Sequence, residues 1–137
     1  MEALRKLHND DLGKLLLRLV VGGLMLFHGI GKVRGGIDGI AAGLPEDIRF
    51  VAYGVYLGEV VGPALVLIGF LTRPGALLIA INMIVAVSMV HSHQVLSINE
   101  RGIYELELQA FYLFGALAIF FLGAGRYSVS RGMSVWD

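Results

Sequence analysis

The stretch FVAYGVYLGEVVGPALVLIGFL, residues 50–71, decides the fold of this chain. It is apolar almost throughout, and a helix needs about 20 such residues to cross the hydrocarbon core of a bilayer. One acid, Glu59, lies near its middle. A charged side chain at that depth costs at least about 2.5 kcal/mol unless it is paired, neutralised or in contact with water. We therefore expect a membrane protein whose polar interior is built around Glu59.

Three glycines surround this acid at intervals of four residues: Gly54, Gly58 and Gly62. In a helix this spacing places them on one face, where a neighbouring helix can approach closely. Pro63 follows, and it predicts a bend or a freed backbone carbonyl about one turn earlier in the helix.

The composition of the whole chain agrees with a membrane protein. Of its 137 residues 56% are hydrophobic, the mean hydropathy is +0.74, and only 16% are charged. Four apolar stretches stand out, each suited to one membrane crossing. The prediction is an all-α, four-helix transmembrane bundle that forms a single domain over residues 1–137, with helices at about 12–30, 50–71, 74–90 and 106–122. Residues 72–75 are expected to form a tight turn between the second and third helices.

Charge and cysteine content exclude several functions. The formal net charge is zero and no Lys/Arg-rich block is present, so a nucleic-acid partner is not expected. The absence of cysteine excludes disulfides and thiol chemistry within the chain. The first apolar stretch contains Lys14 and Arg18 and exceeds a signal-peptide core in length, so we do not expect a cleaved leader.

The distribution of Lys and Arg predicts the orientation. The side that would hold both termini carries seven of the 11 basic residues: Arg5, Lys6, Lys14, Arg18, Arg73, Arg126 and Arg131. The opposite side carries Lys32, Arg34, Arg49 and Arg101. Because cytoplasmic loops are enriched in Lys and Arg, we expect both termini on the cytoplasmic side of a bacterial inner membrane.

Arg18 is the cation that we expect to pair with Glu59. In two antiparallel helices Arg18 and Glu59 would lie about 18 Å and about 14 Å below the outer helix ends, at a rise of 1.5 Å per residue. A guanidinium holds a carboxylate through two parallel hydrogen bonds. Two alternatives stay open: Arg18 reaches for lipid headgroups, and Glu59 is a neutral acid bonded to a backbone carbonyl.

Further polar residues should gather on the outer side of Glu59, because three helix ends meet there. The candidate ligand-binding residues are Arg18, His28, Lys32, Tyr56, Glu59, His91, Glu105 and Gln109. An apolar slot with histidine and a buried carboxylate suits a quinone-like molecule, which needs hydrogen-bond partners able to exchange protons. The alternative is that His28 and His91 are interfacial residues without a ligand. Asn82 is expected to form a hydrogen bond between helices, and no metal site is predicted.

The order of these motifs resembles the DoxX family of small bacterial membrane proteins. The likeness covers about residues 12–130 and rests on motifs in the following order: Arg18, His28-Gly29-x-Gly31-Lys32, Gly58-Glu59-Val60-Val61-Gly62, Gly69-Phe70-Leu71-Thr72-Arg73, Tyr104-Glu105 and Gly123-Ala124-Gly125-Arg126-Tyr127-Ser128. Many relatives read Gly-Pro-Gly and Ser-x-Asp in the closing segment, where this chain has Ala124 and Ser130.

The resemblance implies a four-helix membrane bundle and a connection to redox biology. DoxD relatives belong to a thiosulfate:quinone oxidoreductase, and some DoxX members are linked to quinone or thiol stress. The residues that the resemblance marks are Arg18, His28, Lys32, Glu59, Arg73 and Glu105.

Three functions follow as hypotheses. The first is a membrane component of an oxidoreductase system that binds a quinone-like molecule, with an oxidoreductase protein or further copies of this chain as partners. The second is a non-catalytic scaffold or assembly subunit whose glycine ridge packs against a partner. The third is a small proton-coupled transporter.

Overall fold

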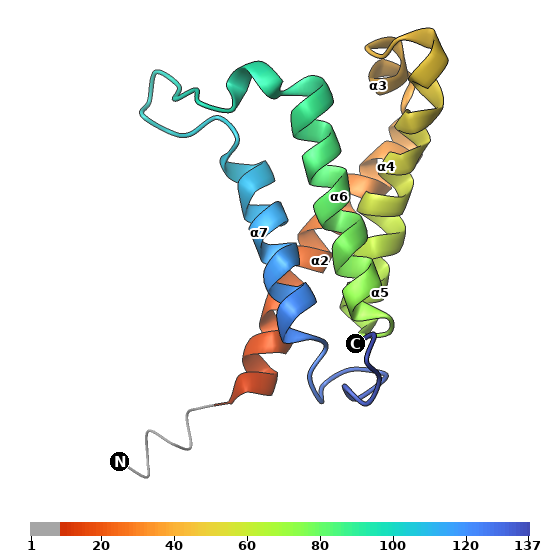
Figure 1. Ribbon diagram of the computed structural model, residues 1–137, viewed down its shortest axis with the longest axis vertical. Coiled ribbons are helices and arrows are strands. Elements are labelled where there is room, and N and C mark those ends of the chain that lie inside the picture. The colour runs from red at the N-terminus through yellow and green to blue at the C-terminus, as the bar shows by residue number, and fades with distance from the viewer. Residues whose placement is uncertain (1–8) are drawn as a thin grey trace.

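The computed structural model describes residues 9–137, which form an elongated bundle of helices (Figure 1). The first helix is α2, Asp10–Gly35. The second is continuous but changes its winding, through η1 (Glu46–Tyr53), α4 (Gly54–Tyr56), η2 (Leu57–Val61) and α5 (Gly62–Ile68). The third is α6, Thr72–Val90, and the fourth is α7, Glu107–Leu122. Two short helices, α3 (Asp38–Ala42) and η3 (Ser92–Gln94), lie in the connections.

The four predicted apolar stretches all form helices, and within the described residues no strand is present beyond an isolated bridge between Ile98 and Tyr104. One boundary prediction is wrong. Residues 72–75 are the first turn of α6, and the tight turn lies over residues 69–71, where Gly69 and Leu71 both have positive φ. Pro74 is tolerated there because the first turn of a helix has free N–H groups anyway. Arg5 and Lys6 of the charge count lie outside the described residues.

The winding of the second helix changes where the sequence has its acid and its proline. Residues 57–61 form a π-helical turn, and Gly62 N–H donates to the carbonyl of Leu57 five residues earlier. Pro63 has no N–H, so the usual bond to the carbonyl of Glu59 cannot form. The predicted disturbance before Pro63 is therefore present, and π turns of this kind often occur at functional sites.

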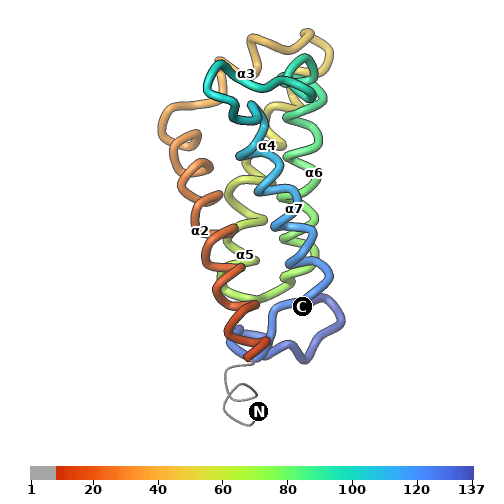
Figure 2. Tube along the Cα trace, turned by 90° about the vertical axis from the view of Figure 1, so that its left-hand side faces the viewer, coloured from red at the N-terminus to blue at the C-terminus, as the bar shows by residue number. Residues whose placement is uncertain are grey.

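Helix α6 is at the centre of the packing. It lies against α5 on one side and α7 on the other, and α2 contacts both α5 and α7 (Figures 1 and 2). The core between them is apolar and fully buried, and it consists of Val21, Met25, Val66, Ala76, Ile79, Ala80, Met83, Tyr112, Ala116 and Ile119. A smaller cluster of Ile37, Leu44 and Ala52 lies under the α3 connection.

Two of the three predicted ridge glycines pack against α6. A Cβ on Gly58 would overlap the side chain of Asn82, and a Cβ on Gly62 would come within 2.8 Å of the Gly75 carbonyl. Gly54 has no neighbour within 4 Å of that position, so it does not pack against another helix of this chain. The change from 3₁₀ to α to π winding alters the angle between successive residues, so a spacing of four does not keep Gly54 on the same face.

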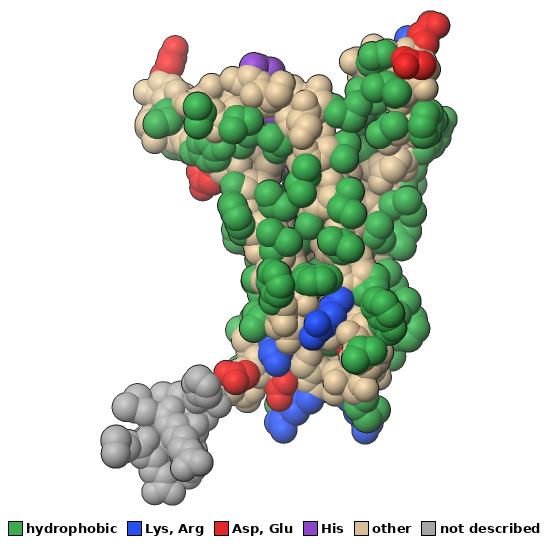
Figure 3. Space-filling view, in the orientation of Figure 1, with side chains coloured by type: hydrophobic (Ala, Val, Ile, Leu, Met, Phe, Trp, Pro, Cys, Tyr) green, Lys and Arg blue, Asp and Glu red, His purple; other side chains and the backbone are tan. Residues whose placement is uncertain are grey.

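The outer surface of the bundle is rich in large apolar side chains, among them Phe27, Phe50, Phe114 and Phe121. In Figure 3 hydrophobic side chains cover the middle of the visible face, while most charged side chains gather toward its two ends. Within residues 9–137, three helices are long and apolar enough to cross a membrane: Asp10–Gly35, Glu46–Ile68 and Thr72–Val90. Helix α7 is apolar but shorter. The chain is a membrane protein in contact with lipid.

Candidate functional site

Glu59 lies at the centre of a polar cluster inside the bundle. Its carboxylate oxygen Oε1 accepts a hydrogen bond from Lys32 Nζ at 2.5 Å and another from Asn82 Nδ2 at 3.2 Å. These three residues, which we call the Glu59 cluster, come from α2, the π turn and α6. Glu59 is only 4% exposed, whereas the Lys32 side chain is 31% exposed. The cluster therefore links three helices through one buried carboxylate oxygen.

Two glycines allow this arrangement. A Cβ on Gly29 would overlap the backbone carbonyl of Glu59, so α2 approaches the π turn as closely as two backbones can. Lys32, one turn after Gly29, then reaches the carboxylate. On the opposite side, the missing side chain at Gly58 leaves room for Asn82 beside Glu59. The local sequence thus places a cation and an amide on either side of the acid.

The second carboxylate oxygen of Glu59 has no partner. Oε2 is buried, and no hydrogen-bond donor contacts it within the described part of the chain. Leaving a buried acceptor unsatisfied costs about 1–3 kcal/mol, and more for a charged group. A hydrogen-bond donor placed at Oε2 would remove this cost.

Two cavities meet at the Glu59 cluster. The larger, which we call the apolar cavity, has a volume of about 270 Å³ and lies between the second helix, the α3 connection and α6. The smaller, which we call the histidine cavity, has about 140 Å³ and extends toward α7. Lys32, Glu59, Ala86 and His91 line both cavities. Together their volumes fall in the range of about 300–1,000 Å³ that is usual for ligand pockets.

The walls of the two cavities differ in chemistry. Beyond the shared residues and Asn82, the apolar cavity is lined only by aliphatic side chains: Ile40, Leu44, Val51, Ala52, Val55, Val85, Met89 and Val90. The histidine cavity adds His28, Gln109 and Tyr112 to two methionines and a leucine. An apolar ring fits the first cavity, and the second offers groups that can exchange hydrogen bonds and protons.

The two histidines of the histidine cavity are held by local contacts. His28 Nδ1–H donates to the carbonyl of Leu24 at 3.1 Å, which leaves its Nε2 as an acceptor in the neutral ring. The His28 ring also meets the Tyr112 ring edge to face, with centroids 5.7 Å apart. His91 Nδ1 and Gln94 Oε1 form a hydrogen bond at 2.7 Å just after α6 ends. Both rings are thus oriented before any ligand enters.

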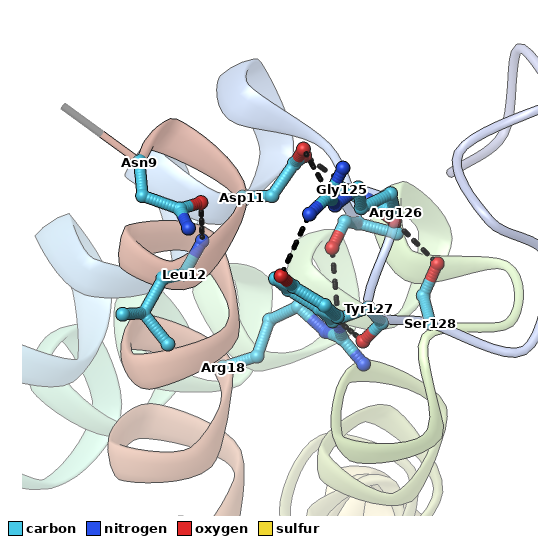
Figure 4. Close-up of polar contacts among 9 residues, drawn as sticks. Asn9, Asp11, Leu12, Arg18, Gly125, Arg126, Tyr127 and Ser128 are labelled. Carbon is cyan, nitrogen blue, oxygen red and sulfur yellow. Dashed lines mark hydrogen bonds and ion pairs between the residues drawn. The ribbon is translucent and has the colours of Figure 1, made fainter. Parts of the chain in front are cut away.

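The predicted Arg18–Glu59 ion pair is wrong. Arg18 is 1% exposed, and its guanidinium donates to four backbone carbonyls: Val66 at 2.7 Å, Leu67 at 2.8 Å, Ala124 at 2.8 Å and Tyr127 at 2.9 Å. Figure 4 shows the side chain directed at the segment that closes the bundle. The carbonyls of Val66 and Leu67 belong to the last turn of α5, where unpaired carbonyls carry partial negative charge. Arg18 is therefore a cap of α5 and is not part of the Glu59 site.

The Arg18–Glu59 prediction failed because it assumed a different axial position of α2 relative to the second helix. Gly29 lies level with Glu59. Arg18 precedes Gly29 by eleven residues, so it lies about 16 Å nearer the start of α2. The prediction aligned the two helices at their outer ends. In the structure η1 extends the second helix outward to Glu46, and the close approach at Gly29 sets the alignment instead.

Two further predicted residues lie apart from the two cavities. Tyr56 packs beside the small cluster of Ile37, Leu44 and Ala52 and does not line either cavity. Glu105 precedes α7 and lines a separate surface hollow of about 610 Å³. The chain unwinds after α6 and starts α7 only at Glu107, so Glu105 lies outside the helix, while Gln109 lines the histidine cavity. His28, Lys32, Glu59, His91 and Gln109 do come together.

The predictions missed Asn82 and Tyr112 as members of the site. The expected helix-to-helix hydrogen bond of Asn82 is confirmed, and its partner is Glu59 itself. The signal was available, since an amide in the middle of an apolar helix needs a partner. Tyr112 stands three residues after Gln109 on α7, and the spacing already places both on one face.

The opposite end of the bundle, where α2 begins and the chain ends, is closed by residues 123–137 (Figure 1). Ser130 N–H and its hydroxyl both donate to the carbonyl of Gly69, and Arg73 Nε donates to the carbonyl of Asp137 at 3.0 Å. On the exposed surface there, the hydrogen bond from Arg126 to the Tyr127 hydroxyl lowers the pKa of Tyr127 and raises the pKa of Arg126. These contacts close the bundle and lie far from the Glu59 cluster.

Comparison with known proteins identified a family. The family model DoxX matches residues 13–92, more than half of the chain, from the start of α2 to just beyond the end of α6. The matched region contains Lys32, Glu59 and Asn82. No curated protein and no solved structure gave a match.

Proposed function

The chain belongs to the DoxX family, and we propose that it is the membrane component of an oxidoreductase system that binds a quinone-like molecule beside Glu59. In this proposal it is a multi-pass protein of the bacterial inner membrane. Because the chain contains no cysteine for thiol redox chemistry, the electrons travel on a bound cofactor or on a partner protein.

The observation that carries the proposal is the Glu59 cluster between two cavities. A membrane protein that buries a carboxylate and an amide beside a partly exposed ammonium bears a desolvation cost that a purely apolar interior avoids. The aliphatic walls of the apolar cavity suit a ring or its tail, and the Glu59 cluster supplies hydrogen-bonding groups at one edge. A quinone has this combination of an apolar ring and polar edges.

Side chains suited to proton exchange stand on the other side of Glu59. His28 and His91 line the histidine cavity together with Gln109 and Tyr112. Histidine changes its protonation near neutral pH, so it can pass protons between a buried carboxylate and the surface. His28 is exposed and oriented by Leu24, which fits the outer end of such a path.

We further propose four membrane crossings, with α7 as the fourth and both termini in the cytoplasm. Helix α7 is about 24 Å long at 1.5 Å per residue, somewhat less than the hydrocarbon thickness of about 30 Å. It packs along α6, and its exposed side chains include Leu108, Phe111, Phe114 and Phe121. Local thinning of the bilayer accommodates a helix that is a few ångströms short.

The test is binding of a short-tailed quinone to the purified protein in lipid nanodiscs. We expect saturable binding that Asn82→Leu weakens by about tenfold or more, since removing a partner of a buried charge costs several kcal/mol. Glu107→Gln is the control, because Glu107 is exposed and lines neither cavity. Absence of saturable binding, or equal binding by Asn82→Leu and the wild type, would count against the proposal.

The scaffold hypothesis requires a glycine ridge that a partner can reach. Gly58 and Gly62 are covered by α6, so these two glycines pack within the chain, and of the three ridge glycines Gly54 alone stays open to a partner. Co-purification of the protein from mildly solubilised membranes, with Arg101→Glu as a surface control, would identify the oxidoreductase partner or further copies of this chain. Proton-coupled transport by this chain would instead appear as uptake into proteoliposomes that follows a pH gradient.

A further inference from the structure

We infer that the Glu59 site selects a ligand that presents a hydroxyl group, such as a hydroquinone or another phenol, over the same ring with a carbonyl or an ether oxygen. This inference rests on the proposed function, because it specifies which chemical form of the ligand the site holds. Its starting point is the unpaired oxygen Oε2.

The two oxygens of Glu59 differ in what they still need. Oε1 accepts one hydrogen bond from Lys32 and one from Asn82, so both of these bonds are directed at the same atom. Oε2 is buried and has no donor within residues 9–137. A carboxylate beside an ammonium is acceptor-only. Oε2 can therefore accept a hydrogen bond from a ligand and cannot give one.

Ligand forms differ in whether they can form this bond. The oxygens of an oxidised quinone and of an aryl ether are acceptors only, so neither can donate a hydrogen bond to Oε2. A phenolic hydroxyl donates one hydrogen bond, and hydrogen bonds of this kind to a carboxylate are short and strong. The site should hence favour the hydroxyl form by about tenfold or more, as expected for a hydrogen bond to a charged group.

The apolar cavity determines where the rest of the ligand lies. Its walls beyond the Glu59 cluster are aliphatic, with Val55 and Ala52 on the second helix and Val85 and Met89 on α6. A ring placed there makes apolar contacts and meets hydrogen-bonding groups only at the end where Glu59 lies. A water molecule could also donate to Oε2, but it would leave the aliphatic walls without contact. A hydroxylated ring donates to Oε2 and also contacts the aliphatic walls.

Replacing Glu59 by glutamine should reverse the preference. Lys32 and Asn82 are donors, so the glutamine amide would turn its oxygen toward them and place its NH₂ group where Oε2 was. A ligand at this place would then meet a hydrogen-bond donor. We expect Glu59→Gln to lose the preference for the phenol and to bind the carbonyl form more tightly than the wild type does.

Three probes that share one ring test this inference in nanodiscs under anaerobic conditions: an alkylated methoxyphenol, its methyl ether and the corresponding benzoquinone. Wild-type protein should bind the phenol about tenfold or more tightly than the ether, and also more tightly than the quinone. Glu59→Gln should equalise the phenol and the ether and strengthen quinone binding. Glu105→Gln, a matched change outside both cavities, should keep the wild-type order.

The comparison of phenol with ether needs no variant, so it stands even if Glu59→Gln does not fold. Equal binding of phenol and ether by the wild-type protein would overturn the inference, and so would an unchanged order in folded Glu59→Gln. A site that binds the quinone best would leave the proposed function intact and refute only the selectivity. Absence of saturable binding by all three probes would overturn the proposed function, and the inference with it.

Discussion

Arg18 and Glu59 are both buried and charged, and the structure stabilises them in different ways. Arg18 uses four of its five N–H donors on backbone carbonyls at the end of α5 and in the closing segment. Glu59 accepts two side-chain hydrogen bonds on one oxygen and none on the other. Because each guanidinium nitrogen of Arg18 bonds a backbone carbonyl, its role is structural, whereas the unpaired oxygen of Glu59 is the basis of the ligand site that we propose.

Removing the Arg18 guanidinium should strongly destabilise the bundle. Arg18→Met leaves four carbonyls without donors, and the expected loss in free energy of unfolding is roughly 3 kcal/mol or more. Arg49→Met is the control, because Arg49 makes only an exposed pair with Glu46 at 3.7 Å, and such pairs are worth less than about 1 kcal/mol. Thermal unfolding in detergent measures both, and equal losses in the two variants would refute a capping role for Arg18.

The ion pair of Lys32 and Glu59 should show coupling in a double-mutant cycle. Lys32→Met alone strands a buried carboxylate, and we expect a loss of about 2 kcal/mol, at the low end because the ammonium is partly exposed. Lys32→Met with Glu59→Met removes both charges and should be more stable than Lys32→Met alone. Chemical unfolding of the three variants checks this. Additive losses would show that the two residues do not stabilise each other.

At the scale of the element, the second helix combines four segments of different winding. The π turn over residues 57–61 and the missing N–H of Pro63 occur where α2 comes closest, at Gly29. That approach is the reason that Lys32 reaches Glu59. The irregular second helix and Gly29 of α2 thus act together to position Lys32 beside Glu59.

A methyl group at Gly29 should separate these two helices. Gly29→Ala would overlap the carbonyl of Glu59 and the side chain of Val60, and such overpacking costs about 1–3 kcal/mol. Gly31→Ala is the matched control on the same helix, because its Cβ has no neighbour within 4 Å. Alanine is the better helix former by about 1 kcal/mol, so Gly31→Ala should be neutral or stabilising. If Gly29→Ala unfolds at the same temperature as Gly31→Ala, the close approach does not determine the packing.

At the scale of the whole molecule, apolar side chains cover the middle of the bundle and charged ones lie mostly toward its ends (Figure 3). The first residues of α2 and the end of the chain lie at one end, and the connection between α6 and α7 lies at the other (Figures 1 and 2). If the bundle crosses the membrane along its length, these two ends face opposite compartments.

Single cysteines test that topology, because the natural chain has none. Leu96→Cys lies in the connection between α6 and α7 and Met133→Cys in the closing segment, and both positions are more than 80% exposed. In intact cells without an outer-membrane barrier, an impermeant maleimide should label Leu96→Cys at once and Met133→Cys only after lysis. Labelling of both positions from the same side would mean that α7 does not cross the membrane.

The sequence by itself determined the helical class, the approximate extent of the four helices and the choice of Glu59 as the central acid. These features depend on local properties: the length of an apolar run, the period of a helix and the cost of a charge among apolar residues. Even the disturbance before Pro63 follows locally, since the missing N–H affects only the preceding turn.

Only the tertiary structure decided which cation meets Glu59. Lys32 and Arg18 stand fourteen residues apart on one helix, and both were available until the height of α2 against the second helix was fixed. That height depends on the contact of Gly29 with the Glu59 carbonyl, between residues distant in sequence, which no periodicity records. The unpaired oxygen Oε2 could not be predicted for the same reason, because its burial depends on the packing of several helices around it.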